Sequence, residues 1–410
     1  AARVESAFHT ADALVTEGRY EEAKSLLETT RFEGGDAIPA AYLLAVVYAR
    51  KGDLDRAEKL LRQILSREPG IDAVRIELVK ILAAQGKRQG ASYQLSRLTD
   101  TADLARDKDQ LEQLARQIGS TEGFSLSGYV SLAPSTNVND GTSQSIIMIG
   151  GLPFLIANGA RQQSGVGVRT GLVGGYAHSF DERHSAYASV SAGLSDYSND
   201  QFDRQHVELR TGVRHDRISY SLQAEVIVDR HWQNMTASSL GIGGRVSGKW
   251  NFSQGWWLSG EIIRMHRRFD LIPAANAVTT RGTVALRHAF SNRFAMSVSG
   301  TLETESVAAR SWSSYMSPSA TLGLEAGLMH GIWMNASLSA GSRNFEGLFP
   351  GLRLVRRDTF QEARASFRKD NFEIAGLSPI VGIFRREQQS NVAFYQYATT
   401  GLDLTFTKAF

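Results

Sequence analysis

The last ten residues of the chain, 401–410, alternate strictly between apolar and polar side chains. Successive side chains of a β-strand point to opposite faces, so this alternation predicts a strand with one apolar and one polar face. The apolar register holds Leu402, Leu404, Phe406 and Phe410 with only Lys408 intervening, and the polar register holds Asp403, Thr405 and Thr407.

The same alternation recurs along the chain from residue 121 onward, for example over 218–229, 240–252 and 278–290. Runs of this length are long for a soluble sandwich, whose strands usually have about five or six residues. A strand with a lipid-facing apolar side and a lumen-facing polar side is typical of an outer-membrane β-barrel. The pattern therefore predicts a transmembrane barrel over 121–410, with the aromatic Phe410 as its assembly signal, rather than a soluble sandwich.

Short and long connections alternate between the predicted strands. Tight turns recur at 181–183, 215–217, 253–255, 291–293, 330–331 and 369–371. Longer polar connections are expected near 196–202, 231–237, 266–276, 306–313, 344–357 and 387–393. Six turns give twelve strands, and a first strand from Phe124 and a last one ending at Phe410 make fourteen antiparallel strands. Since short turns of such barrels face the periplasm, an even number places both barrel ends and the preceding residues there.

The first 120 residues have a helical pattern with an internal repeat. Three sets of residues are spaced by 34 positions, and a 34-residue period is that of the tetratricopeptide helix–turn–helix repeat. The pattern predicts a three-repeat α-solenoid over 1–120, so that the whole chain is an α + β, multidomain protein. The repeated positions are Gly18, Gly52 and Gly86, then Ala23, Ala57 and Ala91, then Leu27, Leu61 and Leu95.

Stacked helical repeats form a concave surface that suits peptide binding. On this basis we expect Tyr42 and Tyr48 to contact a client protein. A structural cap or an assembly platform is the alternative role for the repeats.

Composition argues against several classes of protein. The net charge is only +3 and the charges are dispersed, so the sequence gives no support for a nucleic-acid partner. The chain has no cysteine, which removes thiolate metal sites and cysteine nucleophiles. No Gly-x-Ser-x-Gly, Walker or His-Glu-x-x-His motif is present. We therefore expect a protein that is not an enzyme and that has no cofactor and no metal site.

The first long connection, 134–163, is unusually apolar for a surface loop. Exposing an apolar segment to water is unfavourable, so the segment should be buried against something. It either folds into the barrel as a plug or contacts an exported substrate; packing on neighbouring loops or extension of a strand is the alternative. The residues that carry this expectation are Ile146, Ile147, Met148, Leu152 and Phe154.

Six charged residues are expected to line the barrel lumen. Such residues either line a pathway or pair across the lumen and stiffen it, and we favour pairing. They are Arg169, Glu225, Arg245, Lys249, Arg281 and Arg287.

Helical repeats followed by a fourteen-stranded barrel resemble the surface lipoprotein assembly modulator (Slam) family. Two segments carry the resemblance: Leu-Ala-Pro-Ser-Thr-Asn-Val-Asn at 132–139, and Ser-Asn-Val-Ala-Phe-Tyr-Gln-Tyr at 390–397, which leads to Phe410. The resemblance implies an outer-membrane translocator that moves lipidated or soluble client proteins to the cell surface or the medium. It implies that periplasmic repeats hold the client or its chaperone. Outer-membrane lipid and the barrel-assembly machinery are further implied partners.

Two other functions remain open at this point. A polysaccharide exporter also combines repeats with a barrel, although such exporters usually resemble longer repeat arrays and wider barrels. A passive porin-like channel with an assembly domain is the third possibility. A client that crosses a fourteen-stranded barrel would have to be unfolded, because the lumen is narrow compared with a folded domain.

Overall fold

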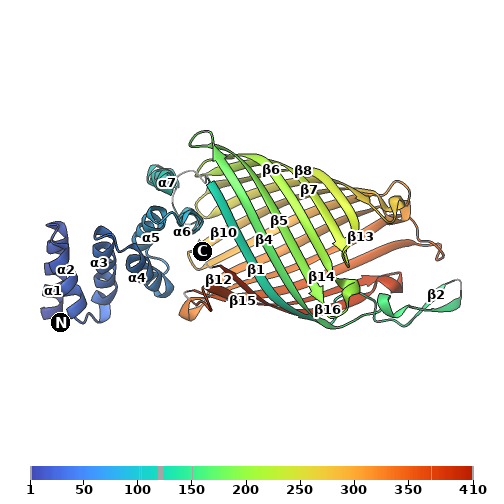
Figure 1. The fold of residues 1–410 in the computed structure, drawn as a ribbon, viewed down its shortest axis with the longest axis horizontal. Coiled ribbons are helices and arrows are strands. Elements are labelled where there is room, and N and C mark those ends of the chain that lie inside the picture. The colour runs from blue at the N-terminus through green and yellow to red at the C-terminus, as the bar shows by residue number, and fades with distance from the viewer. Residues whose placement is uncertain are drawn as a thin grey trace.

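The computed structural model describes residues 2–100, 102, 104–118, 123–149, 151–370 and 372–408. Within these residues, seven α-helices precede fourteen long strands that form one closed barrel, and a separate two-stranded hairpin follows the first barrel strand (Figure 1). The helices stack in a row that continues from one end of the barrel. We call that end of the barrel the repeat end and the opposite end the far end.

The helices form three helix–turn–helix pairs and one further helix. Each pair turns at a glycine with positive φ, at Gly18 (78°), Gly52 (83°) and Gly86 (71°), a conformation that glycine adopts without strain. The predicted repeats are therefore confirmed at their turns. The helices are α1 Ala2–Thr16, α2 Tyr20–Thr29, α3 Ala37–Arg50, α4 Leu54–Arg67, α5 Asp72–Ala84, α6 Arg88–Thr99 and α7 Leu104–Ile118.

Small side chains let the two helices of each repeat approach closely. Ala23, Ala57 and Ala91 are completely buried. Around Ala57 and Ala91, the larger apolar side chains of α3 to α7 form one core, in which burying a leucine contributes roughly 1.5–3 kcal/mol. Ile218, from the turn between two barrel strands, packs against the same core. Of the described helices, none is long and apolar enough to cross a membrane.

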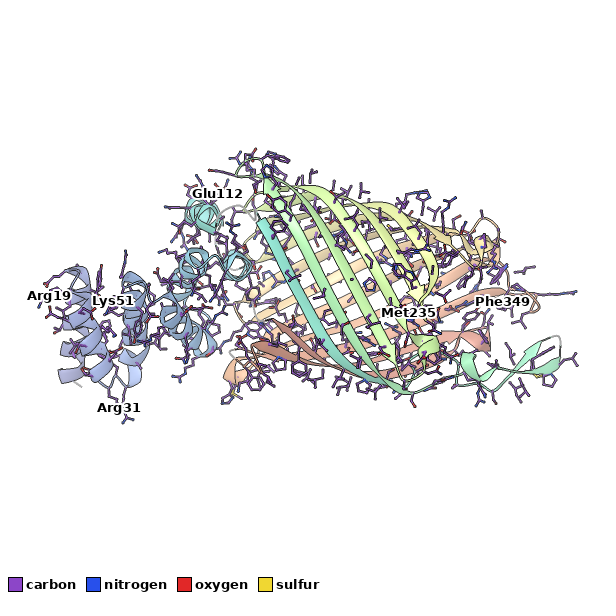
Figure 2. All side chains as sticks on the ribbon, in the orientation of Figure 1. Arg19, Arg31, Lys51, Glu112, Met235 and Phe349 are labelled. Carbon is purple, nitrogen blue, oxygen red and sulfur yellow. The ribbon has the colours of Figure 1, made fainter. Side chains whose placement is uncertain are left out.

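The barrel is antiparallel throughout and closes where its first strand meets its last. Outward side chains such as Leu172, Ile262 and Leu338 are apolar and exposed, and side chains project from the wall all around the barrel (Figure 2). An apolar outer face is what lipid requires. The strands are β1 Gly123–Ser135, β4 Gly165–Ser179, β5 His184–Tyr197, β6 Arg204–Asp216, β7 Tyr220–Gln233, β8 Thr236–Ser253, β9 Trp256–Phe269, β10 Ala277–Ser291, β11 Phe294–Ser306, β12 Tyr315–Gly327, β13 Ile332–Leu348, β14 Val355–Lys369, β15 Leu377–Ser390 and β16 Tyr397–Lys408.

The prediction of fourteen strands is confirmed, but one predicted long connection is wrong. The segment near 231–237 is a two-residue turn at Asn234 and Met235, whose φ angles of 46° and 58° suit a tight hairpin with matching twist. Met235 lies at the far end, as does Phe349 (Figure 2). The polar residues before and after the turn belong to β7 and β8, which continue further than their apolar positions indicate.

Several inward-facing glycines lie beneath an aromatic ring of the neighbouring strand. A Cβ atom at Gly341 would lie 2.5 Å from Cζ of Phe360 and 2.7 Å from the backbone oxygen of Pro318. These glycines therefore let the rings lie flat on the inner wall, an arrangement that also fixes strand register. The glycine–ring pairs that are also register partners include Gly341–Phe360, Gly167–Tyr197, Gly171–Tyr129 and Gly401–Phe384.

Candidate functional site at the junction of the repeats and the barrel

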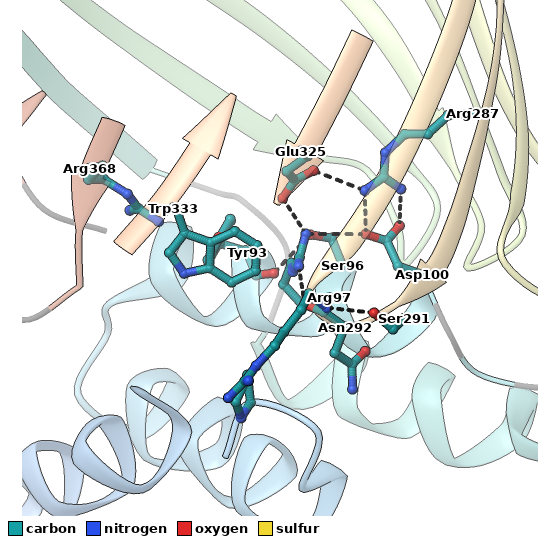
Figure 3. Close-up of polar contacts among 12 residues, drawn as sticks. Tyr93, Ser96, Arg97, Asp100, Arg287, Ser291, Asn292, Glu325, Trp333 and Arg368 are labelled. Atoms are coloured by element: carbon teal, nitrogen blue, oxygen red, sulfur yellow. Dashed lines mark hydrogen bonds and ion pairs between the residues drawn. The ribbon is translucent and has the colours of Figure 1, made fainter. Parts of the chain in front are cut away.

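Arg97 on α6 inserts into the repeat end of the barrel, and only 7% of its side chain is exposed. Its Nη1 donates a hydrogen bond to Oε1 of Glu325 at 2.6 Å, and its Nη2 donates to the backbone oxygen of Asn292 at 2.5 Å. The guanidinium also stacks on the ring of Trp333, 4.7 Å from its centroid (Figure 3). One helix residue thus contacts two strands and one turn of the barrel.

Asp100, directly after α6, extends this contact into a network of four charges. Arg287 lies between two carboxylates, with its Nη1 3.0 Å from Oδ1 of Asp100 and its Nη2 3.1 Å from Oε2 of Glu325 (Figure 3). Two arginines and two carboxylates balance in charge. Because the network is mostly buried, removing one member would leave an uncompensated charge.

Backbone oxygens of the helices supply further contacts to the barrel turns. Arg293 Nη2 donates to the oxygen of Arg67 at 2.5 Å, and Asn251 Nδ2 donates to the oxygen of Thr99 at 3.3 Å. All these barrel residues come from β8 and from β10 to β13 or the turns between them. The repeats are therefore docked on one side of the barrel mouth.

A cavity of about 1560 Å³ opens next to this contact and shares Arg97 and Trp333 with it. Its walls come from α4 to α6 of the repeats, from β1 and β4 to β7 of the barrel, and from β13 to β15. The lining includes Arg75, Tyr93, Phe124, Tyr176 and Tyr187. A space of this size between the repeats and the lumen wall is large enough for a peptide segment.

The six charged residues predicted to line the lumen all have a polar or aromatic partner in the barrel. Arg169 lies 3.1 Å from Asp403, and Arg281 lies 2.5 Å from Glu303. The ammonium of Lys249 lies 3.8 Å from the centroid of the Trp257 ring.

The other three take part in two charge networks on the inner wall. Arg245 lies between Glu225 at 3.1 Å and Glu261 at 2.7 Å, while Arg287 belongs to the junction network. These residues thus form local contacts along the inner wall.

The apolar residues of the first long connection form the hairpin of β2 Ile146–Ile149 and β3 Leu152–Leu155. These two strands pair only with each other among the described strands, and β2 projects beyond the far end of the barrel (Figure 1). Ile146, Met148, Leu152 and Phe154 are exposed, with Phe154 46% exposed, and Ile147 is half-buried. The hairpin therefore lies outside the lumen, and its contact with a client stays a prediction.

The base of the same connection ties β1 to the last strand at the far end. Thr136 N donates to the oxygen of Thr400 at 2.9 Å, and Thr142 Oγ1 donates to the oxygen of Ala393 at 3.0 Å. Asn137 Nδ2 adds a contact to the oxygen of Ala398 at 3.3 Å. We call this set of contacts the far-end staple. Each contact involves one of the two segments that resemble the Slam family: Thr136 and Asn137 lie in 132–139, and Ala393 lies in 390–397.

The two tyrosines predicted on the repeats differ in position. Tyr48 is only 8% exposed, and its hydroxyl donates to Glu28, so its ring packs between helices. Tyr42 is partly buried beside the core of the repeats, and this burial raises the pKa of its hydroxyl. Their contact with a client stays a prediction. Phe410 lies outside the described residues.

Of the junction network, the sequence indicated only Arg287, and as a residue that lines the lumen. Arg97 and Glu325 are 228 positions apart, and a pairing over that distance leaves no local pattern. Among the residues that the structure describes, no group of histidine, aspartate and glutamate could hold a metal ion.

A closed barrel with an apolar outer wall, preceded by tetratricopeptide-like helices, defines an outer-membrane β-barrel protein with a helical repeat region. The model of the surface lipoprotein assembly modifier family matches residues 124–410, and a tetratricopeptide repeat model matches residues 48–114. The chain therefore belongs to the surface lipoprotein assembly modifier family, and the resemblance found in the sequence is confirmed. No curated protein matches the chain.

Solved barrel structures show a weaker similarity. A Pseudomonas aeruginosa FadL homologue has 11% identity and a TM-score of 0.38, over 74% of this chain and 92% of that one. The Acinetobacter baumannii channel DcaP has 9% identity and a TM-score of 0.39, over 69% and 96%. The translocator domain of the Neisseria meningitidis autotransporter NalP has 12% identity and a TM-score of 0.28, over 75% and 96%. The functional proposal below rests on the family match and the junction.

Proposed function

We propose that this protein exports client proteins, either surface lipoproteins or soluble secreted proteins, across the outer membrane. The observation that carries the proposal is the junction: the repeats are docked on one side of the barrel mouth beside a cavity of about 1560 Å³. A client held by the repeats in the periplasm is thereby delivered next to the lumen. The family match to a surface lipoprotein assembly modifier supports a lipoprotein as the first client to test.

The inner wall suits an unfolded polypeptide. Its predicted charges have neighbouring partners, as in Arg245 with Glu225 and Glu261, so these groups are already engaged when a chain passes. The lumen of a fourteen-stranded barrel is narrow compared with a folded domain. The client is therefore unfolded during passage, and a stably folded client found trapped across the barrel would contradict this step.

The other partners in this proposal are outer-membrane lipid, a periplasmic chaperone that hands over the client, and the barrel-assembly machinery. Lipid contacts the apolar outer face, where Leu172 and Ile262 are exposed. The chaperone contacts the repeats. No nucleic acid takes part.

The first experiment compares surface-shaved and secreted proteins of the native host with and without the gene, and with the gene restored. We expect one or two proteins to leave the surface, accumulate in the periplasm and return on restoration. Unchanged surface proteins with loss of a surface polysaccharide would instead indicate a polysaccharide exporter. No change in either would indicate a passive channel.

A further inference from the structure

We propose that the junction cavity is a binding site for an extended, acidic segment of the exported protein, which adds to the edge of β1 as an extra strand. This inference rests on the proposed function and names the part of the client that the cavity receives. Three features carry it: the pairing of β1, the charge of the cavity and the two faces of the strand beside it.

β1 has one edge that is paired over only part of its length. On one side it pairs with β4 from Gly123↔Ala177 to Ser135↔Gly165. On the other side its described partners in β16 are matched at Tyr129–Leu132 and at Ser135. Within the described part of the chain, 123–125 therefore pair with β4 alone, while the register positions opposite 126 and 127 lie outside the described residues. An unpaired strand edge presents backbone N–H and C=O groups that another extended chain can bind.

The first residues of β1, which include this edge at 123–125, lie in the wall of the cavity. Gly123, Phe124, Ser125, Leu126 and Ser127 all line it. Arg88 on α6 is next to them, with Nη1 3.8 Å from the position of a Cβ on Gly123. A segment held by the repeats thus meets this strand edge directly.

The lining of the cavity is basic. It contains nine lysines and arginines but only four aspartates and glutamates. The basic residues are Lys59, Arg62, Arg75, Lys87, Arg88, Arg97, Arg214, Arg368 and Lys369, and the acidic ones are Asp55, Glu58, Asp370 and Glu373. Some of these cations pair with carboxylates, such as Lys87 with Glu58 and Arg97 with Glu325, but the excess favours an acidic ligand.

Arg75 is the cation whose charge is least compensated. It is only 5% exposed, it makes no ion pair with a described residue, and its Nε has no hydrogen-bond partner. Its other nitrogens donate to neutral acceptors, Oε1 of Gln94 at 2.6 Å and the oxygen of Pro69 at 2.7 Å. Burial, together with the nearby positive charge of Arg97, lowers the pKa of Arg75 to about 10, so it remains charged at neutral pH. Asp72 and Asp370 act on Arg75 without an ion pair to it, so an anionic ligand would complete the partners of this buried guanidinium.

The two faces of the strand define the pattern of the bound segment. Phe124 and Leu126 are 91% and 74% exposed, and the Phe124 ring lies 4.8 Å from that of Tyr176. Ser125 and Ser127 alternate with them in the polar register. A strand added beside them would place apolar side chains next to Phe124 and Leu126 and acidic ones on the other face.

The direct test uses the full-length protein in lipid nanodiscs and fluorescein-labelled ten-residue peptides. The probe alternates valine and glutamate, and its matched control alternates valine and lysine. In a third peptide, proline replaces each valine of the acidic probe. This peptide keeps the negative charge but cannot pair as a strand. We expect an increase in fluorescence anisotropy with the acidic probe alone. Equal binding of the acidic and basic peptides, or of the proline peptide, would overturn the proposal.

The substitution Arg75→Gln tests whether the acidic probe binds in the junction cavity. Arg56→Gln is its control, because Arg56 lies on α4 outside the cavity lining. Arg75→Gln should weaken binding of the acidic probe about tenfold, the effect of losing one hydrogen bond to a charged group. Arg56→Gln should leave it unchanged. Unchanged binding in Arg75→Gln, with circular dichroism showing intact helices, would contradict the assignment.

A second measurement does not depend on the fold of the repeats. Because the chain has no cysteine, Ser125→Cys introduces a single thiol at the edge of β1. An acidic probe whose cysteine is activated as a mixed disulfide should exchange onto this thiol and release the activating thiol, and should not do so with Ser297→Cys on the inner wall of β11, outside the cavity lining. Equal crosslinking at both positions would contradict binding of the probe at the edge of β1. Peptide binding and protein export are measured separately, so failure of this inference leaves the proposed function standing, and the reverse also holds.

Discussion

Arg97 is the residue on which the docking of the repeats most depends. Arg97→Met keeps the length and packing of the side chain but leaves Glu325 with one cation fewer in a mostly buried network. Removing one partner of a buried pair costs about 3–5 kcal/mol. We expect the amides of α6 to exchange with deuterium faster in this variant, as measured by mass spectrometry on the protein in nanodiscs.

The control for this prediction is Arg19→Met. Arg19 makes an ion pair with Glu22 at 2.6 Å, but both side chains are more than half exposed. Exposed pairs contribute about 0–1 kcal/mol, so exchange in α6 should not change. Equal exchange of α6 in both variants would show that Arg97 does not hold the junction.

Asp181, in the turn between β4 and β5, has a carboxylate that the turn itself stabilises. Hydrogen bonds from the backbone N–H of Arg183, at 2.7 Å, and from His184 lower the pKa of Asp181 to about 2. An unfolded aspartate has a pKa of about 3.9. The turn should thus gain stability above about pH 4 and lose it as the pH falls through about 2. Carboxyl NMR titration checks the pKa, and a value near 4 would contradict the prediction.

At the scale of single elements, the glycines beneath aromatic rings determine how closely strands approach. Gly341→Ala places a Cβ against the ring of Phe360 and the backbone of β12, and overpacking of this kind costs about 1–3 kcal/mol. We expect a lower unfolding temperature, followed by the change in gel mobility on heating. Gly300→Ala is the control, because a Cβ there meets no atom within 4 Å. Equal unfolding temperatures would refute the packing role.

Strands and repeats were predictable from sequence because their signals are local. The alternation of β16 and the 34-residue spacing of the glycines each lie within a short window, so the element types and the fourteen strands follow from them. The turn at Asn234 was missed because polar residues at strand ends look like a loop. The junction network was not predictable, since Arg287 and Asp100 are 187 positions apart and meet only after the barrel closes.

At the scale of the whole molecule, the seam between β1 and β16 has the shortest described pairing in the barrel, and its far end is held by the staple. Few pairs mean a low free energy of local opening. We therefore expect amides of β1 near Tyr129 to exchange with deuterium before those of β10 and β11.

A matched pair of disulfides tests whether opening of the seam causes the faster exchange in β1. Ser131→Cys with Thr405→Cys joins register partners of the seam whose hydroxyl oxygens are 2.9 Å apart. Thr321→Cys with Ser339→Cys does the same between β12 and β13, also at 2.9 Å. Only the first should suppress exchange in β1, and dithiothreitol should restore it. Suppression by both, or by neither, would contradict local opening of the seam.

The far-end staple also bears on how the barrel is completed during assembly. Thr136 and Thr400 are 264 positions apart, and joining chain segments so distant is entropically unfavourable. Once the staple has formed, the remaining pairs between the first and last strands are neighbours of a pair already made, so each closes at little further entropic cost. The sheet then closes from its far end toward the repeats. The growing barrel then stays open longest at the repeat end of the seam, where the first residues of β1 face the junction cavity.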